Sequence, residues 1–145
     1  MLIEKKIIIF DLDGVLINSI KNMEISWNLV SKKFNLNVGF EDYKKHIGLP
    51  FELILKKLNI KKNIKKIKNS YSFYSKKNFK NVKIYPEVKK TLNYLKRKNY
   101  ITAIITSKDR IRTNKIISLL NLRSNFKYIY TANKLIKLKP YPDQI

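Results

Sequence analysis

Apolar positions follow two different periods along the chain, and the change of period divides it into three stretches. Lys6 to Phe10 (KIIIF) is a continuous β-branched and aromatic run, which is typical of a strand buried on both faces of a parallel sheet. From Ser19 to about Asn81 the apolar residues recur every three or four positions, which predicts helices and no strand. Strand and helix patterns alternate again from Pro86 onward.

Several helices are predicted in the middle stretch. Glu41 to His46 is a short helical segment, Pro50 suits a helix N-terminus, and the very basic segment from Asn63 to Phe79 is a longer helix. The first helix carries one apolar stripe, made of Ile20, Met23, Trp27, Val30 and Phe34. We expect the aromatic residues of this region to form its core rather than a stacking platform for bases, namely Trp27, Phe34, Tyr71 and Phe73.

The last stretch predicts a helix after Pro86, a buried strand from Ile101 to Thr106, a helix from Asp109 to Leu120 and a strand from Phe126 to Tyr130. On the second helix we expect four inward side chains, Ile111, Ile116, Ile117 and Leu120. This order predicts an α/β fold, a doubly wound, Rossmann-like parallel sheet with an inserted all-helical domain. The predicted core comprises residues 1–16 and 83–145, and the helical domain comprises residues 17–82.

Polar residues that suit phosphoryl transfer follow the predicted strands. Asp11 and Asp13 follow the first strand, Thr106 and Ser107 end the second, and Lys139 lies in the loop after the third. Ligands bind at the carboxyl ends of strands in such a fold. One carboxylate can attack phosphorus, and a second can protonate the leaving oxygen. A hard cation such as Mg²⁺ fits between anions, while hydroxyl, N–H and ammonium groups stabilise the phosphate oxygens.

Three segments carry a family resemblance. FDLDGVL (Phe10 to Leu16), AIITSK (Ala103 to Lys108) and KPYPD (Lys139 to Asp143) resemble the first three motifs of the haloacid dehalogenase superfamily. The third motif has the form found in the branch of phosphoglycolate phosphatases and β-phosphoglucomutases. The helical insert lies where that branch places its small cap domain.

The resemblance implies a role for each motif residue. Asp11 resembles the nucleophile and a Mg²⁺ ligand, and Asp13 the general acid/base, with its backbone carbonyl on the metal. Thr106 resembles the phosphate-binding hydroxyl, Ser107 offers an N–H group, and Lys139 resembles the lysine that holds nucleophile and phosphate together. An ordinary Asp-Gly turn would also explain Asp11 and Asp13, but not the later motifs. His46 is the single histidine, and we expect it on the surface or interface of the cap rather than in catalysis.

The resemblance implies a Mg²⁺-dependent phosphatase that hydrolyses phosphoglycolate or a sugar phosphate through an aspartyl-phosphate. β-Phosphoglucomutases carry a histidine where this chain has Met23, and a cap arginine near the position of Phe51. Hydrolysis is therefore favoured, with a mutase-like phosphotransferase and a non-catalytic basic binding module as alternatives. The family's fourth, acidic motif does not follow Lys139, and roughly 60 residues of two further βα units are expected beyond it. We therefore expect a truncated sequence that binds Mg²⁺ poorly by itself and leaves Ile7 to Phe10 as an exposed edge strand.

Net charge, cysteine content and the length of the apolar run limit the partners and the location that the sequence predicts. The net charge of +22 suits a polyanion, but Lys greatly outnumbers Arg and the lysines are spread along the chain, so we expect no nucleic-acid partner. The absence of cysteine excludes disulfides and zinc–thiolate sites. The apolar run Ile7 to Phe10 is too short for a signal peptide or a membrane span, which predicts a cytoplasmic protein with no membrane contact.

Overall fold

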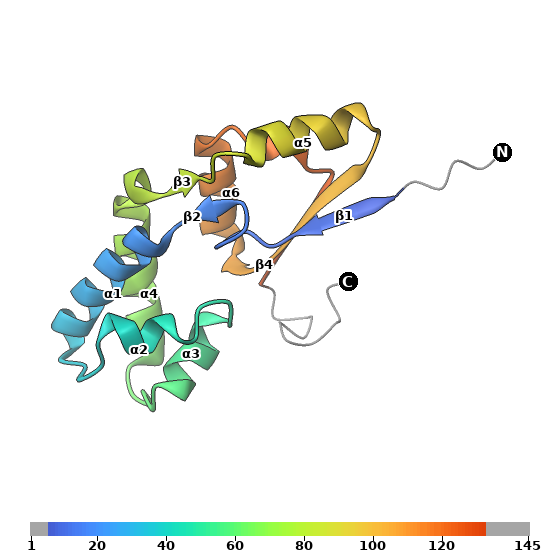
Figure 1. Cartoon of the computed structure of the whole chain (residues 1–145). Coiled ribbons are helices and arrows are strands. Elements are labelled where there is room, and N and C mark those ends of the chain that lie inside the picture. The colour runs from blue at the N-terminus through green and yellow to red at the C-terminus, as the bar shows by residue number, and fades with distance from the viewer. Residues whose placement is uncertain (1–5, 133–145) are drawn as a thin grey trace.

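The computed structural model describes residues 6–132, which form a small parallel sheet with helices and a separate group of helices (Figure 1). The sheet has the strand order β1-β4-β5. Its strands are β1 (Ile7–Phe10), β4 (Ile101–Asp109) and β5 (Tyr128–Ala132), and both neighbouring pairs are parallel. Helices α5 (Val88–Arg97) and α6 (Arg110–Leu119) connect and cover these strands. We refer to the sheet with α5 and α6 as the sheet lobe.

The other helices form what we call the helical lobe, which lies beyond the carboxyl end of the sheet (Figure 1). It consists of α1 (Ile20–Phe34), α2 (Phe40–Lys44), α3 (Phe51–Lys57) and α4 (Ile64–Lys77). Two short strands join the lobes, β2 (Ile17–Asn18) and β3 (Lys83–Ile84), and they pair with each other in an antiparallel ladder. Short 3₁₀ turns lie at Phe79–Asn81 and Arg123–Asn125.

Each lobe has its own cluster of buried apolar side chains. The cluster of the sheet lobe is mostly aliphatic, with Leu12, Leu16 and Ile104 among its fully buried members. The cluster of the helical lobe is built around Trp27, Tyr43 and Tyr71. The predicted division into residues 1–16 with 83–145 and residues 17–82 stays a prediction, but separate clusters are what two packed units would show.

The fold class agrees with the sequence, and several details differ. The α/β order and the parallel sheet are confirmed, and no strand lies between residues 19 and 81, a range that is described throughout. The pattern missed β2 and β3, since two-residue strands carry no periodicity. Ile111 is 68% exposed and Phe73 is 53% exposed, so both inward predictions were wrong. Helix α6 buries the face of Thr113, Ile116 and Ile117, and Ile111 lies two residues, about 200°, away from Thr113 around the helix.

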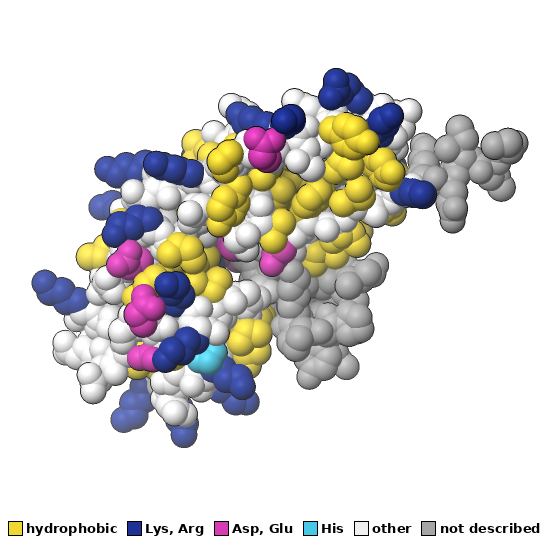
Figure 2. Space-filling model, viewed as in Figure 1, with side chains coloured by type: hydrophobic (Ala, Val, Ile, Leu, Met, Phe, Trp, Pro, Cys, Tyr) yellow, Lys and Arg dark blue, Asp and Glu magenta, His cyan; other side chains and the backbone are white. Residues whose placement is uncertain are grey.

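Strand β1 is more exposed than its sequence predicted. Ile7 is 54% exposed and Ile9 is 44% exposed, because within residues 6–132 β1 pairs along one edge only, with β4. Figure 2 shows the resulting band of apolar surface on the sheet lobe. The prediction of a strand buried on both faces is thus wrong for the described residues, while the prediction of an apolar edge strand is confirmed. No helix in the same range is both long and apolar enough to cross a bilayer.

Candidate active site

A cavity lies between the carboxyl end of the sheet and the helical lobe. The sheet lobe lines it with charged and hydroxyl side chains, and the helical lobe lines it with apolar side chains and tyrosines. Its lining is Asp11, Asp13, Met23, Tyr43, Ile47, Gly48, Leu49, Phe51, Ile54, Tyr71, Thr106, Ser107, Lys108 and Arg112.

The turn after β1 brings two carboxylates to this cavity. Leu12 is fully buried in the sheet lobe, and its carbonyl accepts from the N–H groups of Leu16 and Ile17 at 3.0 and 3.1 Å. Gly14 has φ +81°, a conformation that residues with a Cβ rarely adopt, and its N–H donates to the Ile17 carbonyl at 2.8 Å. The chain therefore folds back after Asp13, and the two aspartates flank a buried anchor residue while both face the cavity.

Both carboxylate oxygens of Asp13 have partners. Ser19 Oγ donates to Oδ1 at 2.5 Å, and Lys108 Nζ lies 3.1 Å from Oδ2. The Lys108 side chain is only 6% exposed, and its burial lowers the pKa of the ammonium, with the Asp13 charge acting in the opposite direction. These contacts fix the orientation of the Asp13 carboxylate, because one oxygen is held by Ser19, directly before α1, and the other by Lys108 on β4.

The end of β4 supplies hydroxyl groups through an irregularity in the ladder. Pairing with β5 shifts register between Ile105 and Asp109, and such a bulge re-aims the side chains within it. Thr106 Oγ1 accepts from the backbone N–H of Lys108 at 3.2 Å. Ser107 Oγ is buried without a hydrogen-bond partner among the described residues. A buried hydroxyl without a protein partner is costly, which makes it a natural contact for a ligand oxygen.

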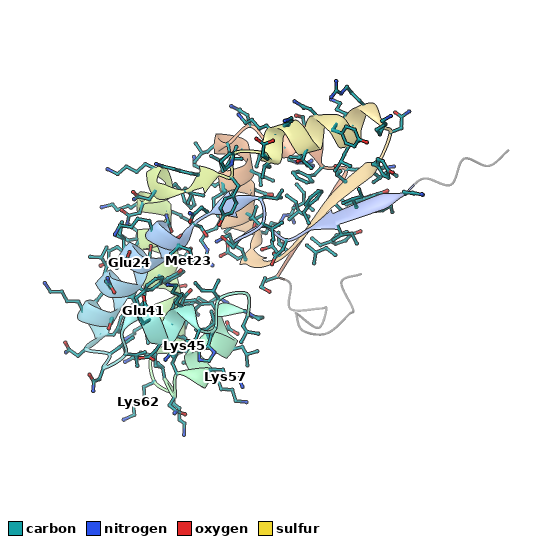
Figure 3. The ribbon with its side chains drawn as sticks, viewed as in Figure 1. Met23, Glu24, Glu41, Lys45, Lys57 and Lys62 are labelled. Atoms are coloured by element: carbon teal, nitrogen blue, oxygen red, sulfur yellow. The ribbon has the colours of Figure 1, made fainter. Side chains whose placement is uncertain are left out.

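The helical lobe closes the cavity with an aromatic wall. Tyr43 OH donates to Tyr71 OH at 3.0 Å, and the ring of Phe51 packs on that of Tyr71 with centroids 4.6 Å apart. Burial raises the pKa of both tyrosines, most strongly that of Tyr43. Met23 lies on the part of α1 nearest the sheet (Figure 3). The wall therefore presents neutral hydroxyls within an apolar surround.

Arg112 of α6 is a second buried cation at the cavity. Its Nε donates to Asp109 Oδ2 at 2.5 Å, and the other oxygen of Asp109 caps α6 by accepting from the Arg112 N–H at 2.9 Å. Burial acts to lower the pKa of Arg112, but Asp109, Tyr71 and Tyr43 together hold it above its ordinary value. For Asp109, burial acts to raise the pKa, but Arg112 and Lys108 hold it below its ordinary value.

The structure brings together four of the five residues singled out from the sequence. Asp11, Asp13, Thr106 and Ser107 line one cavity. The fifth, Lys139, lies outside the described residues. His46 is half-buried next to the lining residue Ile47 and is not itself part of the lining, as expected of a residue on the helical lobe.

Sequence reasoning missed several residues that shape the cavity. Lys108 was part of a quoted motif without a role, although a lysine directly after a phosphate-binding segment could have drawn attention. Arg112 and Asp109 carry a local signal, since an Asp three residues before an Arg at a helix start is a capping pattern. Ser19 and Tyr43 carry none, because their place depends on how the chain packs.

The donor set suits a magnesium ion that is shared with a substrate. Within residues 6–132 no group of three or more His, Cys, Asp or Glu side chains could hold an ion by itself. Mg²⁺ commonly uses one or two carboxylates, retains waters and takes substrate phosphate oxygens. Because Ser19 and Lys108 hold both carboxylate oxygens of Asp13, the Asp11 carboxylate is the one that would hold such an ion, as the resemblance of the first motif implies.

Comparisons with known proteins agree with one another. Residues 8–145 match the family described as haloacid dehalogenase-like hydrolase. The chain is 30% identical to phosphoglycolate phosphatase of Haemophilus influenzae, over 94% of this chain and 67% of the relative, and 27% identical to pyrophosphatase PpaX of Oceanobacillus iheyensis, over 95% and 64%. The crystal structure of a predicted phosphoglycolate phosphatase from Haemophilus somnus superposes with a TM-score of 0.79 at 29% identity, covering 95% of this chain and 67% of that one.

Proposed function

Because this chain belongs to the haloacid dehalogenase-like hydrolase family, we propose that it is a Mg²⁺-dependent phosphatase that acts on a small-molecule phosphate monoester. The observation that supports this most is the cavity itself. It places the carboxylates of Asp11 and Asp13 beside the hydroxyls of Thr106 and Ser107, at the carboxyl ends of two adjacent parallel strands. Phosphoglycolate and sugar phosphates are the candidate substrates, because relatives bear the name phosphoglycolate phosphatase and the motifs match that branch.

In the proposed mechanism Asp11 is the nucleophile. Its carboxylate oxygen attacks phosphorus, the bond between phosphorus and the ester oxygen breaks, and the leaving oxygen takes a proton from the Asp13 carboxyl. The product of this half-reaction is an aspartyl-phosphate on Asp11. Asp13 then removes a proton from water, the water oxygen attacks phosphorus, and inorganic phosphate leaves with Asp11 restored.

The neighbours of Asp13 prepare it for the second half-reaction. Ser19 and Lys108 hold its carboxylate at 2.5 and 3.1 Å, so its direction is set before substrate arrives. In the second half-reaction this fixed direction lets the carboxylate remove a proton from the attacking water.

The phosphate oxygens have candidate partners on β4. The hydroxyls of Thr106 and Ser107 and the N–H groups of that segment can donate to equatorial oxygens, and the unpartnered Ser107 Oγ is the clearest of these groups. Lys139 remains a prediction for the same oxygens. When bound, Mg²⁺ would neutralise charge between Asp11 and the phosphate and so allow two anions to meet.

The proposal is tested by Mg²⁺-dependent phosphate release, with the gene expressed from its natural start to its natural stop codon. We would assay p-nitrophenyl phosphate and a panel of small phosphate esters, with and without Mg²⁺. Asp11→Asn removes the nucleophile, so turnover should fall by at least about a thousandfold. Glu41→Gln, at an exposed carboxylate of the helical lobe, is the matched control and should retain wild-type turnover.

Two results would contradict the proposal. Full turnover in Asp11→Asn would show that Asp11 is not the nucleophile. Absence of turnover from well-folded protein would favour a non-catalytic basic module, whose binding to a polyanion should weaken steeply with salt. Lysines of the helical lobe such as Lys45, Lys57 and Lys62 (Figure 3) are exposed and do not line the cavity, so they could serve such a module without the catalytic residues.

A further inference from the structure

Arg112 is a buried cation that the proposed mechanism does not use. The residue is 8% exposed, lies on α6 and lines the cavity; it also borders a second hollow between α4 and the start of α6. Burying a cation is costly unless it is paired, and here Asp109 supplies one pairing through Nε. A guanidinium carries five N–H donors in a planar fork, so one carboxylate contact through Nε leaves much of its donor capacity directed elsewhere.

The rest of the guanidinium faces the helical lobe. Its central carbon lies 5.3 Å from the centroid of the Tyr71 ring, which itself lines the cavity. The Tyr71 hydroxyl is in turn hydrogen-bonded to that of Tyr43. Arg112 and the two tyrosines therefore form one polar corner, which we call the arginine–tyrosine corner. The neighbouring lining from the helical lobe is apolar, consisting of Met23, Ile47, Leu49, Phe51 and Ile54.

The charge of this corner is fixed. Arg112 stays protonated, because its pKa lies above the ordinary value of an arginine, which is itself far above physiological pH. Both tyrosines stay neutral, because burial raises their pKa values, and a neutral hydroxyl can donate a hydrogen bond. Because the Tyr43 hydroxyl donates to Tyr71, the corner offers one cation and one hydroxyl donor, that of Tyr71, which suits a planar anion better than an uncharged hydroxyl or alkyl group.

We infer that the arginine–tyrosine corner selects phosphate monoesters whose alcohol part carries a carboxylate a short distance from the ester oxygen. The inference rests on the proposed function, since it assumes that the phosphate binds at Asp11, Thr106 and Ser107 in the same cavity. A short phosphocarboxylate would then reach both groups at once. An ester of a neutral alcohol or sugar offers Arg112 no carboxylate beyond that of Asp109. Arg112 is accordingly a specificity-determining residue.

The test compares two ligands that differ in one group, 2-phosphoglycolate and 2-hydroxyethyl phosphate. Binding is measured by titration calorimetry in the Asp11→Asn protein, where turnover is blocked, at the same Mg²⁺ concentration for both ligands. With Arg112 present, the carboxylated ligand should bind at least about tenfold more tightly. Adding Arg112→Met should abolish that preference and change the affinity for 2-hydroxyethyl phosphate by less than about threefold. Arg110→Met is the matched control, because Arg110 is exposed on the same helix and should leave the preference intact.

The ratio of the two affinities separates selection from structural support. Poor folding would weaken the binding of both ligands and leave the ratio of their affinities unchanged. An unchanged ratio in Arg112→Met would therefore overturn the inference. Should that variant fail to fold, Arg112→Lys keeps the charge without the fork and should lower the ratio several-fold, and an unchanged ratio there would also overturn it. Because binding is measured without turnover, a wild-type protein that prefers the carboxylated ligand but hydrolyses neither would refute the proposed function and leave this inference standing.

Discussion

The two lobes meet at one cavity but contribute different chemistry to it. From the sheet lobe come two carboxylates, two hydroxyls and two buried cations, each on or next to the end of a strand. From the helical lobe come aromatic and aliphatic side chains that also belong to that lobe's own core, such as Tyr43, Ile54 and Tyr71. The sheet lobe keeps its aliphatic cluster apart from the cavity, whereas the helical lobe uses its core as the cavity wall.

This difference predicts that substitutions in the two lobes have different effects on activity and stability. In the sheet lobe, replacing a cavity residue on β4 or in the turn after β1 should change the chemistry for every substrate and leave packing nearly intact. Arg112 on α6 is the exception, because it is proposed to select among substrates. In the helical lobe, packing and cavity shape are coupled, because the same aromatic rings form the core of the lobe and line the cavity.

The largest effect is expected at Trp27, the centre of the helical lobe. The residue is fully buried, its ring stacks on Tyr43 with centroids 4.6 Å apart, and its Nε1 donates to the Val38 carbonyl at 3.1 Å. Trp27→Ala should lower the free energy of unfolding by about 4 kcal/mol, measured by urea denaturation. Leu29→Ala, at an exposed position of the same helix, should change it by less than about 0.5 kcal/mol. A loss below about 1 kcal/mol at Trp27 would mean that the aromatic cluster does not hold this lobe together.

A second effect is expected at Lys108, which orients Asp13. Lys108→Met keeps the buried aliphatic stem and removes the ammonium, so turnover should fall about a hundredfold. Since Asp13 serves every ester alike, the fall should be the same for carboxylated and uncharged substrates. Lys115→Met, at an exposed position of α6, is the control in the same steady-state assay. A fall confined to one class of ester would assign Lys108 to recognition and break the contrast between the lobes.

The smallest effect of the three is expected at Asp109, and it depends on pH. Asp109→Asn keeps an oxygen to cap α6 but leaves the buried Arg112 without its carboxylate, which should cost about 2 kcal/mol of unfolding free energy at pH 7. The pKa of Asp109 is held below its ordinary value, so this stabilisation is complete above about pH 4, the unfolded value, and is lost as pH falls through the lower folded value.

Urea unfolding of both proteins between pH 7 and pH 3 measures this difference. It should stay constant down to about pH 4 and then shrink. Glu52→Gln, which breaks an exposed 2.6 Å contact with Lys68, should change stability by less than about 0.5 kcal/mol throughout. A difference at Asp109 that does not vary with pH would show that the capping hydrogen bond, not the charge, matters there.

The sequence predicted the sheet lobe better than the helical lobe for a physical reason. The side chains of Asp11, Asp13, Thr106 and Ser107 follow continuous apolar strands, and parallel strands bring their carboxyl ends to one edge whatever the rest of the chain does. Their convergence on one cavity therefore follows from strand order alone. The wall formed by Tyr43, Phe51 and Tyr71 depends on how three helices pack, which periodicity does not specify.

Errors in the prediction have the same origin. Phe73 has the residue type of a core position, but it lies on the exposed face of α4. Tyr71, two residues earlier, lies on the buried face. Ile7 and Ile9 read as a central strand because that pattern reports the residue types and not which neighbours are present. Lys108 and Arg112 were overlooked since a lysine or arginine in this basic chain is usually a solvated side chain, and burial alone distinguishes these two.

The ladder between β2 and β3 has a consequence for the ancestry of such chains. Ile17 pairs with Ile84 and Asn18 with Lys83, so the chain leaves the sheet lobe and returns to it at adjacent points, and directly paired residues lie about 5 Å apart. A two-residue hairpin turn would bridge that gap. Everything between is, in effect, one long loop whose length and sequence can be exchanged without rerouting the strands. A lineage could therefore reshape the apolar and aromatic wall of the cavity by replacing a single contiguous segment of its gene, while the residues of the sheet lobe are inherited unchanged.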